Sequence, residues 1–379
     1  MADALFIGLM SGTSLDGVDV ALVAFTQDEL DNSRQVPKVL HTHFLAYPQS
    51  LRKQILALQH PTDNELETTA LMANTLAKLY AEAVNQLLEI NQISPENIIA
   101  IGCHGQTIRH QPEQQFTLQI GNAALLTELT NITVVADFRS RDIAAGGQGA
   151  PLVPAFHQAV FASRHENRAL INIGGIANIT YLAKTGESLA NASEVLGFDS
   201  GPGNMLLDAW IKRHKDLDFD ADGAWAASGQ VIAPLLVSML AEPYFDMPPP
   251  KSTGRDLFNE SWLDQKLSGQ NYRTQDVART LVELTAQTIH HALLDYCDIV
   301  DSIHLCGGGA RNTLLKDCLQ SMLTHTKVET TAALGVGVDW VEAIAFAWLA
   351  KQCLHQQPAN LPQVTGAKSA RILGAIYQR

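Results

Sequence analysis

Polar residues beside glycines mark the places in this chain where chemistry could occur. The first is MSGTSLDGVD, residues 10–19, where hydroxyls and carboxylates lie between two apolar runs. Its amides and hydroxyls would form a nest for an anion such as phosphate, with Gly12 and Gly17 free to take positive φ. Asp16 and Asp19 could hold a hydrated magnesium ion, which needs only one or two carboxylates. An ordinary surface hairpin is the alternative, and the missing lysine excludes a Walker A loop.

A second candidate is GFDSGPGN, residues 197–204. We expect Asp199 to end a short strand, which would place its carboxylate in a crevice, and Pro202 to lie near the start of a helix. Amides at that helix N-terminus would attract phosphate oxygens and lower the pKa of Asp199, keeping it ionised. The alternative is that Asp199 is simply a helix N-cap. The spacing of Ser200 to its glycines excludes a nucleophile elbow.

Two further stretches carry candidate binding residues. HLCGGGARN, residues 304–312, runs from an apolar strand into three glycines, which would let a flat ring or a ribose approach the backbone, although plain strand-to-helix turns also use glycine. Strand-like runs are followed by the polar residues Gln106, Arg139, Arg141 and Asp142, and the specificity residues of α/β proteins gather at such strand ends. They could bind a polyhydroxylated substrate. For each arginine, a solvated surface charge is the alternative, and the histidines show no metal-ligand spacing.

Composition excludes several functional classes. The chain has 379 residues and a formal net charge of −13, with no basic block, so a nucleic-acid partner is disfavoured. Its apolar runs are shorter than the roughly 20 residues of a membrane span, and no signal-like start is present, which indicates a cytoplasmic protein. The five cysteines never form a CxxC pair. We therefore expect reduced, mostly buried thiols rather than disulfides or a zinc site.

Strand-like and helix-like runs alternate along the chain, which predicts an α/β fold with helices covering mixed or parallel sheets. A hairpin is expected at 4–10 and 19–26, and a long helix after a capping-box spacing of Thr62 and Glu65. Residues 168–183 repeat the pattern of two apolar runs flanking a glycine turn, which hints at duplication. Further strands are expected at 98–103, 116–120, 132–136, 303–308 and 326–330. Further helices are expected at 203–214, 230–241, 274–297 and 338–352, with another that begins after the glycines at 307–309 and ends near Met322.

Taken together and in order, the motifs resemble the anhydro-N-acetylmuramic acid kinase family. The segments that carry the likeness are MSGTSLDGVD, CHGQTIRH, ADFRSRDIAAGGQGAPLVPAFH, INIGGIANIT, GFDSGPGN, KSTGRDLFN and CGGGARN. The resemblance implies the sugar kinase, Hsp70 and actin superfamily: two duplicated ribonuclease H-like α/β domains with an interdomain ATP cleft. The first domain would comprise residues 1–150, rejoined by 340–379, and the second residues 151–339.

The resemblance also assigns residues to the nucleotide. Residues 199–203, with Gly201 and Gly203, match the family's second phosphate loop. Residues 306–312, with Gly307, Gly308 and Asn312, match the adenosine segment. The first phosphate loop matches the opening turn, namely Gly12, Thr13, Ser14, Leu15, Asp16, Gly17, Val18 and Asp19.

The implied reaction converts 1,6-anhydro-N-acetylmuramic acid, ATP and water to N-acetylmuramic acid 6-phosphate and ADP, as part of peptidoglycan recycling and amino-sugar catabolism. Because the substrate has no free 6-hydroxyl, the base must act on water, and by position Asp199 is that base. Glu342 could assist, with a core-edge salt bridge as the alternative. Mg²⁺ would neutralise phosphate charge. Another sugar or acetate-type kinase and a nucleotide-driven chaperone-like module remain rival functions, and a homodimer remains open.

Overall fold

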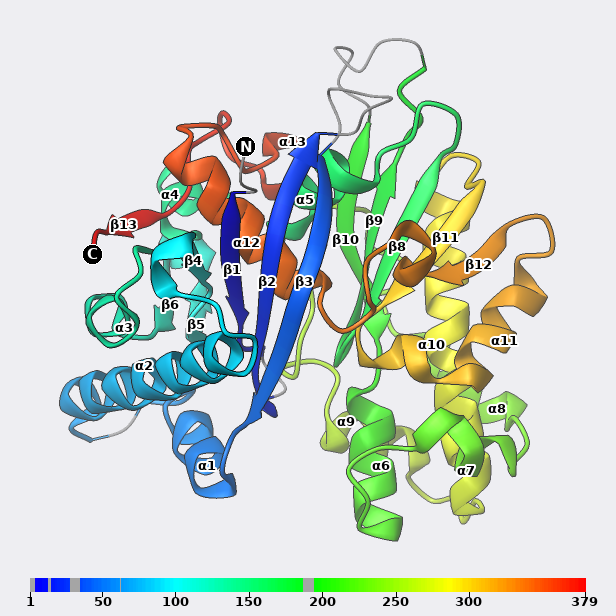
Figure 1. The fold of residues 1–379 in the computed structure, drawn as a ribbon. Coiled ribbons are helices and arrows are strands. Elements are labelled where there is room, and N and C mark those ends of the chain that lie inside the picture. The colour runs from blue at the N-terminus through cyan, green and yellow to red at the C-terminus, as the bar shows by residue number, and fades with distance from the viewer. Residues whose placement is uncertain (1–3, 13–14, 28–34, 62, 187–193) are drawn as a thin grey trace. The chain divides into compact units, whose positions relative to one another are not determined.

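The computed structural model describes residues 4–12, 15–27, 35–61, 63–186 and 194–379. Contacts within the chain divide it into two compact units, one of residues 1–160 with 340–379 and one of residues 161–339. Each unit is built around its own β-sheet (Figure 1).

The first unit holds a six-stranded sheet in the order β13-β7-β4-β1-β2-β3. The strand β1 pairs antiparallel with β2, which pairs antiparallel with β3, while β4 lies parallel to β1 and β7 parallel to β4. A separate hairpin of β5 and β6 lies outside this sheet. The strands are β1 (Leu5–Met10), β2 (Gly17–Gln27), β3 (Gln35–Ala46), β4 (Ile98–Cys103), β5 (Gln106–Gln111), β6 (Phe116–Ile120), β7 (Val134–Ala136) and β13 (Ala375–Tyr377).

Helices cover both faces of this sheet. The long helix α2 (Glu65–Ile90) contacts β2 and β3, whereas α12 (Val341–Leu354) contacts β1, β2 and β4. Because Val18, Val20 and Leu22 pack into the core shared with α2, the alternating residues Asp19 and Ala21 belong to the opposite face. The other helices are α1 (Gln49–Ala57), α3 (Ala123–Thr130), α4 (Ser140–Ala144), α5 (Val153–Phe161) and α13 (Pro362–Thr365).

The second unit holds a five-stranded sheet in the order β10-β9-β8-β11-β12. Its strands are β8 (Arg168–Ile173), β9 (Ile176–Leu182), β10 (Val195–Pro202), β11 (Ser302–Cys306) and β12 (Lys327–Thr330). The long helix α10 (Thr274–Tyr296) packs against β9 and β10. The other helices are α6 (Met205–Lys215), α7 (Ala224–Ala227), α8 (Ala233–Leu240), α9 (Glu260–Leu267) and α11 (Thr313–Met322).

The two sheets share one topology. In both, three consecutive antiparallel strands are followed by a fourth parallel to the first and a fifth parallel to the fourth: β1-β2-β3-β4-β7 and β8-β9-β10-β11-β12. The crossover from third to fourth strand contains the longest helix of each unit, α2 or α10, and the next crossover contains α3 or α11. The predicted duplicated α/β fold is thereby confirmed.

Most predicted elements are confirmed, with shifted ends. The helix predicted at 203–214 is α6, the one at 230–241 is the shorter α8, and the one at 274–297 is α10. The predicted start of α2 is wrong, because the helix begins at Glu65 after Asn64, whose side chain makes no capping hydrogen bond. Thr62 lies outside the described residues. All five cysteines are free and four are buried, as expected.

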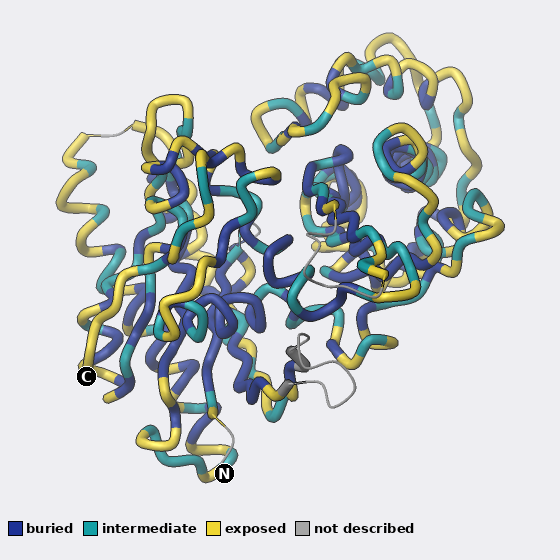
Figure 2. Tube along the Cα trace, turned by 90° about the horizontal axis from the view of Figure 1, so that it is seen from above, coloured by how far each residue is buried: buried dark blue, intermediate teal, exposed yellow. Residues whose placement is uncertain are grey.

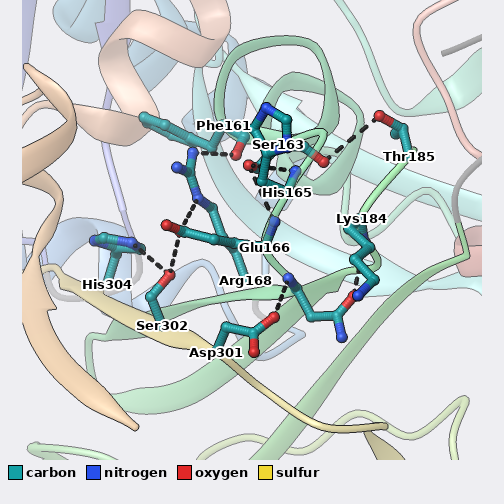
Figure 3. Close-up of polar contacts among 11 residues, drawn as sticks. Phe161, Ser163, His165, Glu166, Arg168, Lys184, Thr185, Asp301, Ser302 and His304 are labelled. Carbon is teal, nitrogen blue, oxygen red and sulfur yellow. Dashed lines mark hydrogen bonds and ion pairs between the residues drawn. The ribbon is translucent and has the colours of Figure 1, made fainter. Parts of the chain in front are cut away.

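Buried residues line the strands of each unit, and exposed ones lie on the outer surfaces of the helices and loops (Figure 2). No helix among the described residues is long and apolar enough to cross a membrane. In the second unit, a polar cluster occupies the sheet edge where β8 and β11 begin (Figure 3). There the Glu166 carboxylate accepts hydrogen bonds from Arg168 and Ser302, so the polar groups of this cluster bond to one another.

The helix α12 lies close to its sheet because two strands carry glycine where it crosses. A Cβ atom on Gly8 would lie 1.7 Å from the Ala343 carbonyl oxygen, and one on Gly102 would lie 1.9 Å from that of Phe346. Neither obstacle is a flexible side chain. The sheet and α12 could therefore not keep this spacing with any larger residue.

We expect Gly8→Ala to lower the free energy of unfolding by about 3 kcal/mol, because α12 must move away from β1. Urea denaturation followed by circular dichroism measures the loss. Gly186→Ala is the control, since a Cβ there meets nothing within 4 Å and only the positive φ of 62° is unfavourable. Equal stability of Gly8→Ala and the wild type would contradict this account of the packing.

Candidate functional site

In the first unit, the candidate residues gather at the edge where the parallel strands β1, β4 and β7 end. Ser11 and Gly12 follow β1, His104 follows β4, and Arg139 lies shortly after β7. The amide of His104 donates to the Leu9 carbonyl at 3.1 Å, which ties the ends of β1 and β4 together. Such strand ends are where ligand-binding residues of α/β sheets collect.

Side chains from β5 and from the segment after β3 hold the opening turn, and α2 supports them. Gln106, which is fully buried, accepts from the Ser11 hydroxyl and donates to the Gly12 carbonyl at 3.2 Å. The Ser11 hydroxyl also lies 2.7 Å from that of Tyr47, which donates to Tyr80 at 3.3 Å. Gln106 therefore supports the turn through these contacts, and its predicted role in binding substrate stays a prediction.

Arg139 and His104 extend this support. The His104 Nδ1 lies 3.1 Å from the Ser11 carbonyl oxygen, which can only accept, so Nδ1 carries the proton. Nε2 is then the acceptor for Arg139 Nη2 at 3.0 Å. Burial, followed by the Arg139 charge, lowers the pKa of His104 to about 3, which keeps the imidazole neutral. Burial lowers the pKa of Arg139 to about 10, opposed by Glu342 and Asp142.

Asp142 is fully buried and both its oxygens are occupied. Oδ2 accepts from the Gly149 amide at 2.7 Å, while Oδ1 accepts from Asn360 at 2.6 Å and from Thr365 at 2.7 Å. The carboxylate thus ties the central glycine-rich loop to the C-terminal segment. Its predicted role in binding substrate stays a prediction, and its geometry is that of a residue that shapes the loop beside Arg139.

The opening turn differs from expectation in its backbone. Gly17 does not take a positive φ; it starts β2, and a Cβ there would lie 2.4 Å from the Leu45 carbonyl oxygen. Among the described residues of the turn, Leu15 takes the left-handed conformation, with φ 60°. Gly17 is therefore needed for strand pairing, and the prediction of its positive φ was wrong. Val18 is buried in the core, while Thr13 and Ser14 lie outside the described residues.

Three carboxylates were predicted to act at or beside this turn, namely Asp16, Asp19 and Glu342. Asp16 is exposed, whereas Asp19 is half-buried on the sheet face that α12 covers. Glu342 lies in the first turn of α12, where the helix dipole favours a negative charge, and it acts on Arg139 electrostatically. Among the described residues, no group of three or more His, Cys, Asp or Glu side chains forms a metal site. The exposed and half-buried carboxylates still suit Mg²⁺, which takes few protein ligands.

In the second unit, Asp199 lies within β10 rather than at its end. The pairing of β10 with β9 shifts between Asp199 and Gly201, so Ser200 forms a bulge, a feature that redirects side chains. Asn178 on β9, directly opposite, donates to Asp199 Oδ1 at 2.9 Å. Ser252 Oγ at 2.9 Å and the Thr253 amide at 3.0 Å donate to Oδ2.

The predicted cause of ionisation at Asp199 was wrong. Burial raises the pKa of this carboxyl group, and the hydrogen bonds from Asn178, Thr253 and Ser252 oppose that rise. The helix amides expected to lower the pKa are engaged elsewhere: those of Gly203 and Asn204 donate to the carbonyls of Gly175 and Gly174 at 2.9 and 2.8 Å. Asp199 is not a helix N-cap either, because Asn204 precedes α6.

The glycines after Asp199 allow close packing. A Cβ on Gly203 would lie 2.4 Å from the Gly174 carbonyl oxygen, and one on Gly201, whose φ is 154°, would lie 2.8 Å from the Phe245 ring. Both glycines therefore bring β10 and the start of α6 against the β8–β9 turn and the Phe245 ring. Their predicted contact with phosphate stays a prediction.

The three glycines after β11 differ from one another. A Cβ on Gly307 would lie 2.3 Å from the Asn172 side chain, and one on Gly309 would lie 2.2 Å from Ile173, so packing requires both. At Gly308 the nearest atom would be 3.8 Å away, which leaves its backbone accessible to a ligand. Asn312 caps α11 by accepting from the Leu315 amide at 3.1 Å.

Sequence reasoning missed the residues that surround Asp199. Asn178, Tyr244, Lys251, Ser252 and Thr253 all contact it through a side chain or the backbone. The available signal was the KSTGRD motif, which follows a proline-rich loop too long to be a simple connection. Nothing in the spacing of 199 and 252 showed that these segments meet.

The neutral His104 makes stability depend on pH. Its folded pKa of about 3 lies below the ordinary value of 6.5, so the unfolded chain takes up the proton first. The contribution of His104 to the free energy of unfolding should therefore be largest above about pH 6.5. It should decrease toward pH 3, by at most about 1.4 kcal/mol per pH unit. We expect His104→Gln to flatten this decline in urea denaturation between these pH values.

His41→Gln is the matched control, because His41 is exposed. His157, whose pKa burial also lowers to about 3, is retained in both variants and accounts for a remaining slope. An unchanged slope in His104→Gln would show that His104 is not held neutral.

The family model described as anhydro-N-acetylmuramic acid kinase matches residues 4–379. Proteins named anhydro-N-acetylmuramic acid kinase from Nitrosomonas europaea and Thiobacillus denitrificans are each 52% identical over 374 residues, covering 98% of this chain and 99% and 96% of their own. The protein of that name from Nitrosospira multiformis is 50% identical over the full length of both chains. The chain belongs to the anhydro-N-acetylmuramic acid kinase family.

Proposed function

We propose that this protein is a kinase that transfers the γ-phosphoryl group of ATP to O6 of 1,6-anhydro-N-acetylmuramic acid while water opens the anhydro bridge. The products are N-acetylmuramic acid 6-phosphate and ADP. Family membership over the whole chain supports the reaction, and the setting of Asp199 supports the way in which it is catalysed.

The observation that carries the proposal is the uneven hydrogen bonding of the Asp199 carboxylate. Oδ2 accepts two hydrogen bonds, from Ser252 and Thr253, whereas Oδ1 accepts one, from Asn178. Oδ1 thus retains capacity to accept a proton from water. Burial raises the pKa of this group, and a base whose pKa approaches the working pH accepts a proton more effectively.

The bonds change in a balanced way. Asp199 Oδ1 takes one proton from water, and the resulting hydroxide oxygen bonds to C1 of the sugar. The C1–O6 bond breaks, and O6 bonds to the γ-phosphorus as the bond to the β-phosphate oxygen of ATP breaks. The proton leaves Asp199 to solvent after product release. A base that acts on water is needed because O6 carries no proton in the anhydro sugar.

Residues in the two units would bind the nucleotide. We assign the phosphates to residues 12–19, whose start is held by hydrogen bonds of His104 to Ser11 and of Gln106 to Gly12. We assign the adenosine to residues 307–312, where Gly308 leaves the backbone accessible. Asp16 or Asp19 would hold Mg²⁺, which when bound neutralises phosphate charge. Arg139 and Glu342 are assigned to the sugar or to its attacking water.

Asp199→Asn should lower kcat by about a hundredfold or more, because the amide cannot take the proton from water. The binding of ATP, measured by isothermal titration calorimetry, should change little. The measurement is ADP release coupled to NADH oxidation, with the anhydro sugar as substrate. Asp264→Asn is the control, since that carboxylate forms an exposed ion pair with Arg213 in the same unit. Turnover within threefold of wild type would refute the assignment of Asp199.

The substrate class has its own test. The protein should turn over the 1,6-anhydro sugar and leave the opened N-acetylmuramic acid, which has a free 6-hydroxyl, largely unphosphorylated. Mass spectrometry of both reactions after equal times measures this preference. Faster phosphorylation of the opened sugar would favour an ordinary hydroxyl kinase on the same fold.

A further inference from the structure

The residues that position Asp199 come from a loop that carries a buried lysine. Residues 244–253, which we call the arm, follow α8 and end with the first three residues of the KSTGRD motif. Tyr244 OH donates to the Asp199 carbonyl at 2.8 Å, and the Lys251 carbonyl accepts from the Asp199 amide at 3.1 Å. Ser252 and Thr253 then donate to the carboxylate. The arm therefore contacts Asp199 through both its backbone and its side chain.

Lys251 is only 7% exposed. Among the described residues its ammonium forms no ion pair, and a buried lysine without such a partner is rare. Its ammonium donates to the Phe245 carbonyl at 2.9 Å and lies 3.4 Å from that of Tyr244. It also lies 5.0 Å from the Tyr244 ring centre and 5.2 Å from that of Tyr296. The lysine thus joins the two ends of the arm to each other and to the end of α10.

Other contacts fix the arm on the same side. Tyr296 OH donates to the Met247 carbonyl at 3.0 Å, and the Phe245 ring stacks on Phe258 with centres 5.6 Å apart. Phe245 also occupies the space that a side chain at position 201 would need. The arm is therefore a folded loop that packs against β10, and its residues surround the Lys251 ammonium.

We propose that Lys251 is a positioning residue for the base: its buried ammonium closes the arm so that Ser252 and Thr253 hold the Asp199 carboxylate. The hydrogen bonds of the ammonium go to the carbonyls of Tyr244 and Phe245 and not to the Asp199 carboxylate. This inference rests on the proposed function of Asp199. It goes further by assigning a role to the lysine of the KSTGRD motif that a phosphate-binding lysine would not fill, since two aromatic rings and two carbonyls enclose its charge.

The charged and titratable groups around the ammonium are few. Tyr244 lies on the arm itself and Tyr296 on α10, while Asp246 and Asp295 act on Lys251 from those same two segments. Burial lowers the pKa of Lys251 and the two carboxylates oppose this. Removing the ammonium therefore removes the one positive charge among these groups. We then expect Ser252 and Thr253 to be held less firmly against the Asp199 carboxylate.

Lys251→Met keeps an unbranched apolar stem as far as Cε and removes the charged Nζ. We expect kcat/KM to fall about tenfold to a hundredfold, the cost of a misplaced catalytic group, with little change in ATP affinity. Since the hydrogen bonds from Ser252 and Thr253 lower the pKa of Asp199, the acidic limb of the kcat/KM profile should move to higher pH. A loss of general stability would not move that limb.

Lys266→Met is the matched control. The Lys266 ammonium also lies over an aromatic ring, 5.3 Å from the centre of Trp262, and donates to a carbonyl, that of Ser238, at 2.8 Å. It makes no hydrogen bond to the arm. We expect its acidic limb to coincide with that of the wild type, and a shift equal to that of Lys251→Met would overturn the proposal.

Hydrogen exchange measured by mass spectrometry tests the positioning without relying on the reaction. In Lys251→Met, peptides containing the amides of Asp199 and Thr253 should exchange faster, while those of β8 should not. Unchanged exchange in Lys251→Met would overturn the proposal even if the wild-type protein is an active kinase. If exchange is faster in the variant but the wild-type protein shows no kinase activity, only the proposed function is refuted.

Ser252→Ala keeps the proposal testable if Lys251→Met does not fold. Ser252 is exposed, so its removal leaves the fold intact and takes away one donor to Asp199 Oδ2. We expect its acidic limb to shift to higher pH in the same direction. A limb at the wild-type position would show that the arm does not set the protonation of Asp199.

Discussion

The structure of the second unit depends on two opposed effects at Asp199: burial raises the pKa of its carboxyl group, and three hydrogen bonds stabilise the charged form. Burial alone would favour the neutral acid, which cannot act as a base. Full solvation would leave a weak base with an ordinary pKa. The bulge at Ser200, the partner Asn178 on β9 and the two donors from the arm together set a state between these limits.

Duplication gives the two units the same scaffold but different means of rigidity. In the first unit, the turn after β1 is held by neutral polar side chains, with Gln106 and His104 bonded to backbone carbonyls. In the second, the corresponding turn after β8 is held by amides from the start of α6, which donate to Gly174 and Gly175. Both devices occupy polar groups within the protein. After β11, Gly308 differs from Gly307 and Gly309, because the atom nearest to a Cβ on Gly308 would be 3.8 Å away.

Much of the fold could be predicted because it depends on local patterns. Apolar runs around glycine turns indicated both hairpins, and helical periodicity indicated α2 and α10. The edge strand β3 was harder, since QVPKVLHTHFLA is half polar and contains Pro37, which only an edge strand tolerates. The start of α2 was misread because Asn64, rather than a capping box, precedes it.

The candidate site was predictable in its members more than in their roles. The motifs identified Gln106, Arg139, Asp142 and Asp199. They did not show that Gln106 and Asp142 have no exposed surface. Roles depend on contacts across long separations, such as Asp142 with Asn360 and Asp199 with Ser252, and sequence spacing does not encode these. The pKa of Asp199 was misjudged for the same reason, because its donors come from the arm and not from α6.

The most direct test of this account compares two pH titrations of one protein. The carboxyl carbons of aspartate are labelled with ¹³C, the Asp199 signal is assigned by its absence in Asp199→Asn, and its pKa is compared with the acidic limb of kcat/KM, which reports the free enzyme. The account predicts that the two coincide and lie above the ordinary aspartate value. An Asp199 that titrates below that value, or an acidic limb that belongs to another group, would contradict it.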